Sequence, residues 1–476
     1  MADYNRPDVY IEDVSSVASN SGSFSSTVGM LIGSHRSGPI NEPTLVTSWT
    51  DFMQKFCLGL ETPFVAESDL AYAVYGYFAN GGNDLYVVRV ASASAAKAQK
   101  TGAQDKNSNF TFKAFYEGDV TPKVEIVKNE DWDATNKLFD VVVTMNQVDG
   151  DYVAVRGVTK ETILNDVNNT LKGYVTLEIN GTVADLIEEE FSLTGGNSGI
   201  TGLTDADYIA GLEYCNTVED ATFIAIPGET ATNVRNKIIE YADNHELFPI
   251  VEAPVGTTVK NVKGIRREIT AFGGCLVYPW IQIVDPLNDS IKTVPPSGYV
   301  MGVYSRVIGE RGVKKVPAGV DAVMNGVVSL EMRLTDDDIG TLNNAGIVPI
   351  VNKIGVGLVA WGARSLSNDD DMRYVSDIII NYNIKKALYR NTLFAVFEPN
   401  DEILWNKVKS ICDSYLEGLR NEGALKGTAE QAYRVICGET INTEATINDG
   451  FFYVDIAYAP NKPAEFVVIR IKHTMD

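Results

Sequence analysis

Residues 204–286 decide the fold of this protein, and they read TDADYIAGLEYCNTVEDATFIAIPGETATNVRNKIIEYADNHELFPIVEAPVGTTVKNVKGIRREITAFGGCLVYPWIQIVDP. Short apolar runs typical of buried strands alternate with segments whose apolar residues recur at helical spacing. The first helical segment starts with Thr204 and has an acidic residue three positions later, which is a capping pattern. The expected strands are 221–227, 248–254 and 274–286, and the expected helices are 204–215, 230–246 and 262–272. This alternation predicts an α/β layer with a parallel or mixed sheet.

The same kind of pattern begins near the N-terminus. TVGMLIGS (27–34) and DLYVVRV (84–90) are apolar runs that predict buried strands. Between them, SDLAYAVYGYFANGG (68–82) predicts a helix with Ser68 as its N-cap and an Asn-Gly-Gly stop. We interpret the two regions as one core that is split in the sequence.

The segment that splits the core, residues 93 to about 195, has a different character. It contains short β-rich runs between turn residues, such as NFTFKAFYEGD (109–119), KVEIVKN (123–129) and KLFDVVVTMNQV (137–148). The pattern predicts an inserted β domain.

The last third of the chain carries two long helical candidates and ends in strand-like runs. A helix is expected to start after Pro399 and Asn400, with one apolar stripe made by Leu404, Val408, Ile411, Tyr415 and Leu419. The final 26 residues hold two strand-like runs separated by Pro460 and Pro463. Upstream, the helical segment within 294–319 contains small residues at Ser297, Gly298 and Gly302, which would permit close approach of neighbouring elements.

The predicted fold class is a multidomain mixture of α/β and α+β. A central α/β core is interrupted by an inserted β-rich domain and followed by an α+β C-terminal domain, with extended arms at both ends. The expected division is an N-terminal arm at 1–22, core at 23–92, inserted domain at 93–195, core at 196–350, C-terminal domain at 351–464 and C-terminal arm at 465–476.

Composition restricts the function classes. The chain has 476 residues, 63 acidic against 40 basic, and a net charge of −23, which argues against nucleic acid or an anionic membrane as a main partner. The five cysteines are far apart and mostly in apolar context, as expected for reduced core residues. Neither a signal peptide nor a long uncharged apolar stretch is evident, so we expect neither export nor membrane insertion by these routes.

Signals for catalysis are weak. The three histidines lack metal-ligand spacing to Cys, Asp or Glu, and the Gly-Lys dipeptide of a Walker A loop does not occur. GVGLVAWG (355–362) is a poor dinucleotide signature and reads better as a tight turn into a buried strand. TDDDIG (335–340) reads as a helix start with Thr335 as cap, and SNDDDMRY (367–374) as a solvated turn or a salt-bridging patch.

Several stretches together carry a family resemblance. They include RPDVYIEDV at 6–14, SLTGGNSG at 192–199, the segment 294–319, and a run of blocks between 340 and 472 that includes NNAGIVPIVNKIGVGLVAWGARSLSNDDDMRYV. In this order and spacing the chain resembles contractile tail sheath proteins of bacteriophages and related contractile injection systems. Asp8 stands where the family tends to have glycine. The resemblance covers nearly the whole chain except residues 93 to about 190.

The resemblance implies a structural subunit rather than an enzyme, with no cofactor or nucleotide. Sheath subunits stack as rings in a helical array around an inner tube, then contract and drive the tube through a target envelope. The expected partners are other copies of the chain, the tail tube protein, and baseplate and tail terminator proteins. The expected location is the virion tail, with the host cytoplasm during assembly. An α/β nucleotide-binding enzyme and another virion structural protein are the alternatives.

The resemblance also suggests roles for particular residues. The terminal arms would interlock with neighbouring copies through Val9, Tyr10, Ile11, Val14, Phe466, Val468, Ile469 and Ile471. Closure of the subunit's own sheet by these strands is the alternative. The helix 401–420 and the turn after it would lie near the tube and present Asp401, Glu402, Lys407, Lys409 and Lys426. The inserted domain would lie outermost.

Overall fold

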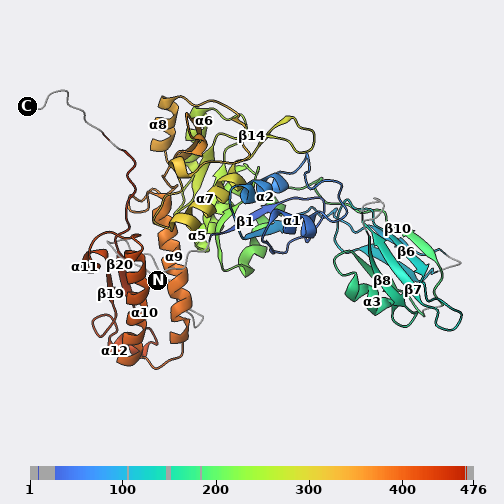
Figure 1. The fold of residues 1–476 in the computed structure, drawn as a ribbon. Helices are drawn as coiled ribbons and strands as arrows, with labels where there is room; N and C mark the ends of the chain where they lie inside the picture. The colour runs from blue at the N-terminus through green and yellow to red at the C-terminus, as the bar shows by residue number, and fades with distance from the viewer. Residues whose placement is uncertain are drawn as a thin grey trace, which may run out of the picture.

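A mixed eight-stranded sheet forms the centre of the molecule (Figure 1). The computed structural model describes residues 9, 27–103, 107–145, 152–182, 185–466 and 468. In sheet order the strands are β18 (Gly357–Ala360), β17 (Ile347–Lys353), β13 (Cys275–Tyr278), β12 (Phe248–Glu252), β11 (Ala221–Ala225), β1 (Val28–Gly33), β3 (Leu85–Arg89) and β2 (Thr44–Val46). The six inner strands are parallel, and the edge strands β18 and β2 are antiparallel to their neighbours. A mixed sheet is one of the two forms that the alternation predicts.

Helices cover both faces of this sheet, so its strands are buried on both sides. Along β1, Leu31 contributes to one core, while Met30 and Ile32 contribute to the other, as the two-residue period of a strand requires. The core that contains Leu31 includes α1 (Trp49–Phe56), α2 (Leu70–Ala79), α7 (Ser297–Arg311) and α9 (Val375–Thr392). The opposite core includes α4 (Asp205–Tyr214), η1 (Cys215–Thr217), α5 (Thr232–Asn244), α6 (Val259–Glu268) and α8 (Asp336–Asn344).

Helices α2 and α7 pack side by side with very little space between their backbones (Figure 1). A Cβ atom added at Gly298 would lie 2.5 Å from the carbonyl oxygen of Ala73, and one added at Gly302 would lie 2.3 Å from that of Tyr77. From the other side, Gly76 receives the ring of Tyr299. The prediction that Gly298 and Gly302 permit close approach is therefore confirmed.

Several sequence-based boundaries differ from the structure. The expected helix at 262–272 is α6, which begins at Val259 because the Thr258 side chain caps it by accepting a hydrogen bond from Asn261 N. Ser68 is not the N-cap of α2; Asp69 holds that position, and Ser68 Oγ donates to the carbonyl of Ser34.

The expected strand 274–286 is two strands. β13 ends at Tyr278, Pro279 follows through a cis peptide bond, and proline has no N–H to donate to a ladder. The second half contains β14 (Ile281–Val284), which forms a separate three-stranded sheet with β15 (Ile291–Val294) and β16 (Ser329–Leu330). In the chain, η2 (Gly319–Asp321) precedes β16 and α8 follows it. The expected core boundary at residue 350 falls inside β17, whose hairpin with β18 continues the main sheet to Ala360.

Residues inserted between β3 and α4 build two antiparallel sheets around a core of their own (Figure 1). One sheet contains β4 (Gln99–Thr101), β5 (Phe110–Ala114) and β9 (Val175–Ile179). The other contains β10 (Glu189–Ser192), β6 (Lys123–Lys128), β7 (Phe139–Thr144) and β8 (Tyr152–Val158), and α3 (Ile163–Thr170) packs nearby. The β-rich character was predicted, whereas α3 was not.

Arg89, the last residue of β3, joins this inserted region to the core. Its guanidinium is fully buried and donates to four backbone carbonyls at 2.6–2.8 Å, those of His35 and Gly38 in the core and of Glu117 and Ser198 in or beside the insertion. Burial lowers the pKa of Arg89 to about 10, so the side chain remains protonated at neutral pH. One side chain therefore connects the segments before, within and after the insertion.

The C-terminal part lies at the opposite end of the core from the insertion in Figure 1. After α9 it contains η3 (Leu393–Ala395), α10 (Glu402–Asn421), α11 (Ala429–Ala432), β19 (Tyr433–Ile436), α12 (Glu444–Asn448) and β20 (Asp455–Tyr458). The expected long helix is α10, with Asp401 as its N-cap. Its buried face includes Trp405 and Cys412, whereas Ile411 of the expected stripe is only partly buried. Among the helices of the described part, none combines the length and hydropathy that crossing a membrane requires.

The α2–α7 contact can be tested with one methyl group. Gly302→Ala should destabilise the core by about 1–3 kcal/mol, because the new Cβ would overlap the Tyr77 carbonyl and force the helices apart. Gly309→Ala is the matched control, since Gly309 lies on the same helix and an added Cβ there would have no atom within 4 Å. The stability of this variant should be unchanged or slightly increased, because alanine has a higher helix propensity than glycine. Thermal unfolding followed by circular dichroism compares the two. Equal melting temperatures would show that the contact is loose.

Arg89→Met tests the connection to the insertion. The variant removes the donors of four carbonyls, and we expect a loss on the order of 3–5 kcal/mol with faster proteolysis in the chain segments beside residues 96 and 197. Lys97→Met is the control, because Lys97 is partly exposed and, within the described part of the chain, donates to one carbonyl, that of Phe115. If both variants were cleaved at the same rate, Arg89 would not hold the joint.

Candidate functional site

Residues 461–466 leave the C-terminal part and run past the start of α9 without forming a strand. Pro463 interrupts this segment, and a proline cannot donate to a strand ladder. The segment is held instead by side chains, above all by Lys462 and Glu465. The strand expected from residue 465 is thus not present at residues 465 and 466, while residue 467 and residues 469–476 lie outside the described part of the chain.

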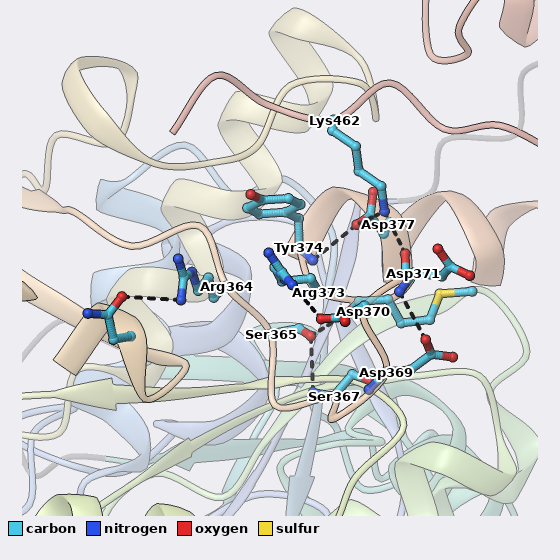
Figure 2. Close-up of polar contacts among 12 residues, drawn as sticks. Arg364, Ser365, Ser367, Asp369, Asp370, Asp371, Arg373, Tyr374, Asp377 and Lys462 are labelled. Atoms are coloured by element: carbon cyan, nitrogen blue, oxygen red, sulfur yellow. Dashed lines mark hydrogen bonds and ion pairs between the residues drawn. The ribbon is translucent and has the colours of Figure 1, made fainter. Parts of the chain in front are cut away.

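Lys462 fixes the first half of the segment (Figure 2). Its Nζ lies 2.8 Å from Asp377 Oδ2 and donates to the carbonyl of Asp371 at 2.7 Å. Asp377 is fully buried in the first turn of α9 and also accepts from Tyr374 N in a capping box. Burial raises the pKa of Asp377, and the hydrogen bond from Lys462 opposes that rise. The lysine therefore supplies the counter-charge for a buried carboxylate.

Glu465 fixes the second half of the segment. Its Oε1 lies 2.9 Å from Arg364 Nε and its Oε2 lies 3.0 Å from Arg364 Nη2, which makes a bidentate ion pair. Asn343 Nδ2 donates to Oε1 at 2.5 Å, and the Tyr374 hydroxyl donates to Oε2 at 3.3 Å. Burial alone would raise the pKa of Glu465, but the hydrogen bonds from Arg364 and Asn343 outweigh it and lower the pKa. Both members of the pair are mostly buried, with side-chain exposures of 18% and 12%.

The acidic turn beneath this segment is closed by its own hydrogen bonds (Figure 2). Asp370 pairs with Arg373, Asp369 accepts from Asp371 N at 2.9 Å, and Ser367 Oγ accepts from Asp369 N at 3.2 Å. Both of the readings made from the sequence apply, because the turn is exposed and contains an ion pair. Within the described ranges, no group of three or more His, Cys, Asp or Glu side chains is arranged to hold a metal ion.

A two-stranded antiparallel sheet lies next to the segment. It pairs β19 with β20, and the part of the chain that the structure describes adds no third strand to it. Leu425 forms an isolated bridge with Pro460, just after β20. Because no further strand of the described residues pairs with β19 or β20, the outer edges of this sheet can accept an added strand.

The expected arm residues are only partly within the described chain. Val9 is described and half-buried, and Phe466 and Val468 are 74% and 78% exposed. The remaining expected arm residues, Tyr10, Ile11, Val14, Ile469 and Ile471, lie outside the described residues. The structure therefore fixes the position of residues 461–466, and both the arms and their expected contacts stay predictions.

The charged residues expected on the tube-proximal helix have different environments. Asp401 caps α10 by accepting from Ile403 N and Leu404 N, and Glu402 lies exposed in the first turn. Lys407 lies over the Phe394 ring at 4.0 Å, and Lys409 pairs with Asp413 at 2.7 Å. Lys426 is exposed in the loop after α10. These residues share the helix and its ends but do not form one cluster.

Sequence reasoning did not single out Lys462, Glu465, Arg364 or Asp377. The partners lie 85 and 101 residues apart, and single charged residues near prolines carry no periodic signal. Only the capping pattern of Asp377, three residues after Tyr374, could have been found locally.

Residues 367–474 match the family model described as the phage tail sheath C-terminal domain. The resemblance to tail sheath proteins is confirmed. The tail sheath protein of Vibrio phage KVP40 is 25% identical over 264 residues, and that of Enterobacteria phage T4 is 22% identical over 317 residues. These matches cover 52% and 60% of this chain and span only 38% and 47% of the length of the two relatives.

Solved sheath structures share the fold over almost the entire chain. A protein of the anti-feeding prophage helical sheath in the contracted state has a TM-score of 0.60 and 22% identity, covering 98% of this chain and 99% of that one. The sheath tail protein of Listeria innocua has a TM-score of 0.66 and 15% identity, covering 92% and 96%. At such identities the likeness establishes a shared fold.

The Arg364–Glu465 pair can be tested through its pH dependence. Because the folded-state pKa of Glu465 lies below its ordinary value of 4.5, the pair should stabilise the segment above that pH and lose its effect as the pH falls through the lowered pKa. Glu465→Gln should therefore raise hydrogen exchange in a peptide covering residues 455–466 about tenfold at pH 7 and much less at acidic pH. Glu398→Gln, at an exposed position, is the control. An effect of Glu465→Gln that is equal at all pH values would contradict the ion-pair role.

Proposed function

We propose that this chain is the structural subunit of a contractile tail sheath. It polymerises as stacked helical rings around an inner tail tube and contracts to drive the tube through the envelope of a target cell. A heterologous contact that repeats without closing generates a helical assembly of this kind. The energy for contraction is stored when the subunits assemble, so the function needs neither a cofactor nor a nucleotide.

The observation that carries the proposal is the anchored root of the C-terminal segment. Two ion pairs fix residues 462 and 465, and the apolar side chains directly beyond them, Phe466 and Val468, are exposed. Next to this root lies the β19–β20 sheet, which contains two strands within the described residues. We propose that the terminal arms, 1–22 and 465–476, add strands to sheets of neighbouring copies, which provides links that survive rotation of the subunits.

The remaining parts take roles that match their positions. We propose the division into core (23–92 and 196–350), inserted domain (93–195) and C-terminal domain (351–464), with the inserted domain outermost and α10 near the tube. Of the charged residues around α10, Glu402 and Lys426 are exposed and have no ion pair with the described residues. Together with Asp401, Lys407 and Lys409 they would complement charges on the tube surface.

The proposed partners are other copies of the chain, the tail tube, the baseplate and the tail terminator. The assembled protein would reside in the virion tail or in a related injection particle, and subunits would assemble in the host cytoplasm.

A nucleotide-binding enzyme with the same α/β core is the alternative, and it predicts measurable cofactor binding. The GVGLVAWG segment offers little support for it, because residues 347–360 form an antiparallel hairpin rather than a phosphate-binding turn before a helix.

The arm hypothesis is tested by deleting residues 1–14. The truncated chain should fold with an unchanged melting temperature and fail to form stable tubes, since a link to the neighbouring copy is lost. Negative-stain electron microscopy compares the truncated chain with the full-length chain, each alone and with a tube partner. Hollow striated tubes are expected for the full-length chain. Tubes of the truncated chain that match those of the full chain would rule out the N-terminal arm as a link.

A further inference from the structure

A surface cavity of about 640 Å³ between α6 and α8 is lined by positive charge. Lys263, Arg266 and Arg267 all come from α6, and Thr341 and Asn344 of α8 add polar atoms on the other side. No carboxylate of the described residues lines this cavity. The cluster is unusual in a chain with 63 acidic and 40 basic residues.

The three cations lack counter-charges within the described part of the protein. Neither Lys263 nor Arg267 has an ion pair there. Arg266 is 8% exposed, and its guanidinium donates to the carbonyls of Ile269 at 3.3 Å and Leu366 at 2.8 Å, while its Nε has no partner in the same part. Burial lowers the pKa of Arg266. A buried cation held only by carbonyls gains from an incoming anion, because the anion offsets part of the desolvation cost.

Three acidic residues of α5 and α6 line a different cavity. A second cavity of about 490 Å³ is lined by Glu240, Asp243 and Glu268, and it shares only Thr270 with the basic cavity. Glu268 directly follows Arg267 in α6, yet the two side chains line different cavities. The separation leaves the basic cavity open to an external oxyanion.

The basic cavity adjoins the root of the C-terminal segment. Asn344 lines the cavity, and its Oδ1 accepts from Arg364 Nη1 at 3.4 Å. Arg364 in turn holds Glu465, and Asn343 donates to the same carboxylate. If the segment beyond Glu465 reaches a neighbouring copy, that copy lies close to the cavity.

We propose that the cavity between α6 and α8 binds carboxylate side chains of a second copy of this chain. The inference rests on the proposed self-assembly and names one surface through which it occurs. The acidic composition supplies the complementary partner, since the chain has 63 acidic against 40 basic residues. Lys263 and Arg267 would form ion pairs across the contact, and Arg266 would give it a fixed, partly desolvated cation.

The test is made in the full-length chain and reverses the charges of Lys263 and Arg267, which, unlike Arg266, are not held by backbone carbonyls in the described residues. Lys263→Glu with Arg267→Glu should raise the concentration at which the chain self-associates at least about tenfold, because like charges would face each other across the contact. Lys100→Glu with Lys172→Glu makes the same charge change at exposed positions in the inserted region and should stay within about twofold of wild type. Sedimentation velocity measures association, and electron microscopy separately records whether tubes form.

Outcomes separate the contact from the proposed function. Selective loss of association in the cavity variant supports the contact, even if the associated wild-type species are not tubes and the sheath proposal fails. Equal association of both variants, or a wild-type chain that never associates, overturns it. A third outcome is that both variants associate equally, while sodium phosphate at constant ionic strength stabilises the wild type but not the cavity variant. This result would assign the cavity to a free oxyanion and would also overturn the proposed contact between copies.

Carbodiimide cross-linking identifies the occupant directly. In a mixture of isotope-labelled and unlabelled chains, an amide between Lys263 and an Asp or Glu of the other isotope is expected. If Lys263 linked only to acidic residues of the same chain, including the C-terminal Asp476, the second copy would be excluded as the occupant.

Discussion

The backbone contact between α2 and α7 is the constraint on which the core depends. α2 precedes the insertion and α7 follows it, so the contact joins segments more than 200 residues apart, as the hydrogen bond between Tyr77 and Ser305 illustrates. Gly298 and Gly302 leave no room for side chains, and the close approach allows both helices to cover the same face of the sheet. Glu252, at the end of β12, then accepts from Ser297 N at 2.6 Å and ties the first turn of α7 to the sheet. Burial raises the pKa of Glu252 to about 7.

The order of strands in the sheet also joins the segments before and after the insertion. β1 lies between β3, which precedes the insertion, and β11, which follows it. The two parts of the core, which are separated in the sequence, are therefore joined by parallel strand pairing in the sheet and by the packing of α2 against α7. The covalent connection through the insertion contributes little to joining the two parts of the core, because the insertion can be long while its two ends remain close together in space.

Local signals in the sequence predicted the elements, and long-range contacts decided the details. The capping boxes at Thr204 and Thr335 and the apolar runs of β11 and β12 depend on near neighbours, so they could be read directly. The division of 274–286 at Pro279 could have been inferred from the missing N–H, but the second sheet that receives β14 could not. The site was less predictable still, since the pairing of Lys462 with Asp377 depends on tertiary placement alone.

The two ends of the insertion meet as a pair. Ala96 N donates to the carbonyl of Asn197, and Asn197 N donates to that of Ala96, both at 2.9 Å, before Arg89 closes the joint. The inserted region between these residues has its own hydrophobic core, and it also contacts the main core through Asp119 N, which donates to the carbonyl of Arg36 at 2.9 Å. A domain with adjacent termini could replace it without altering the sheet, provided that a carbonyl is kept for Arg89 in the position of Glu117. This position is therefore the natural place to graft a cargo, a label or a binding module onto the chain.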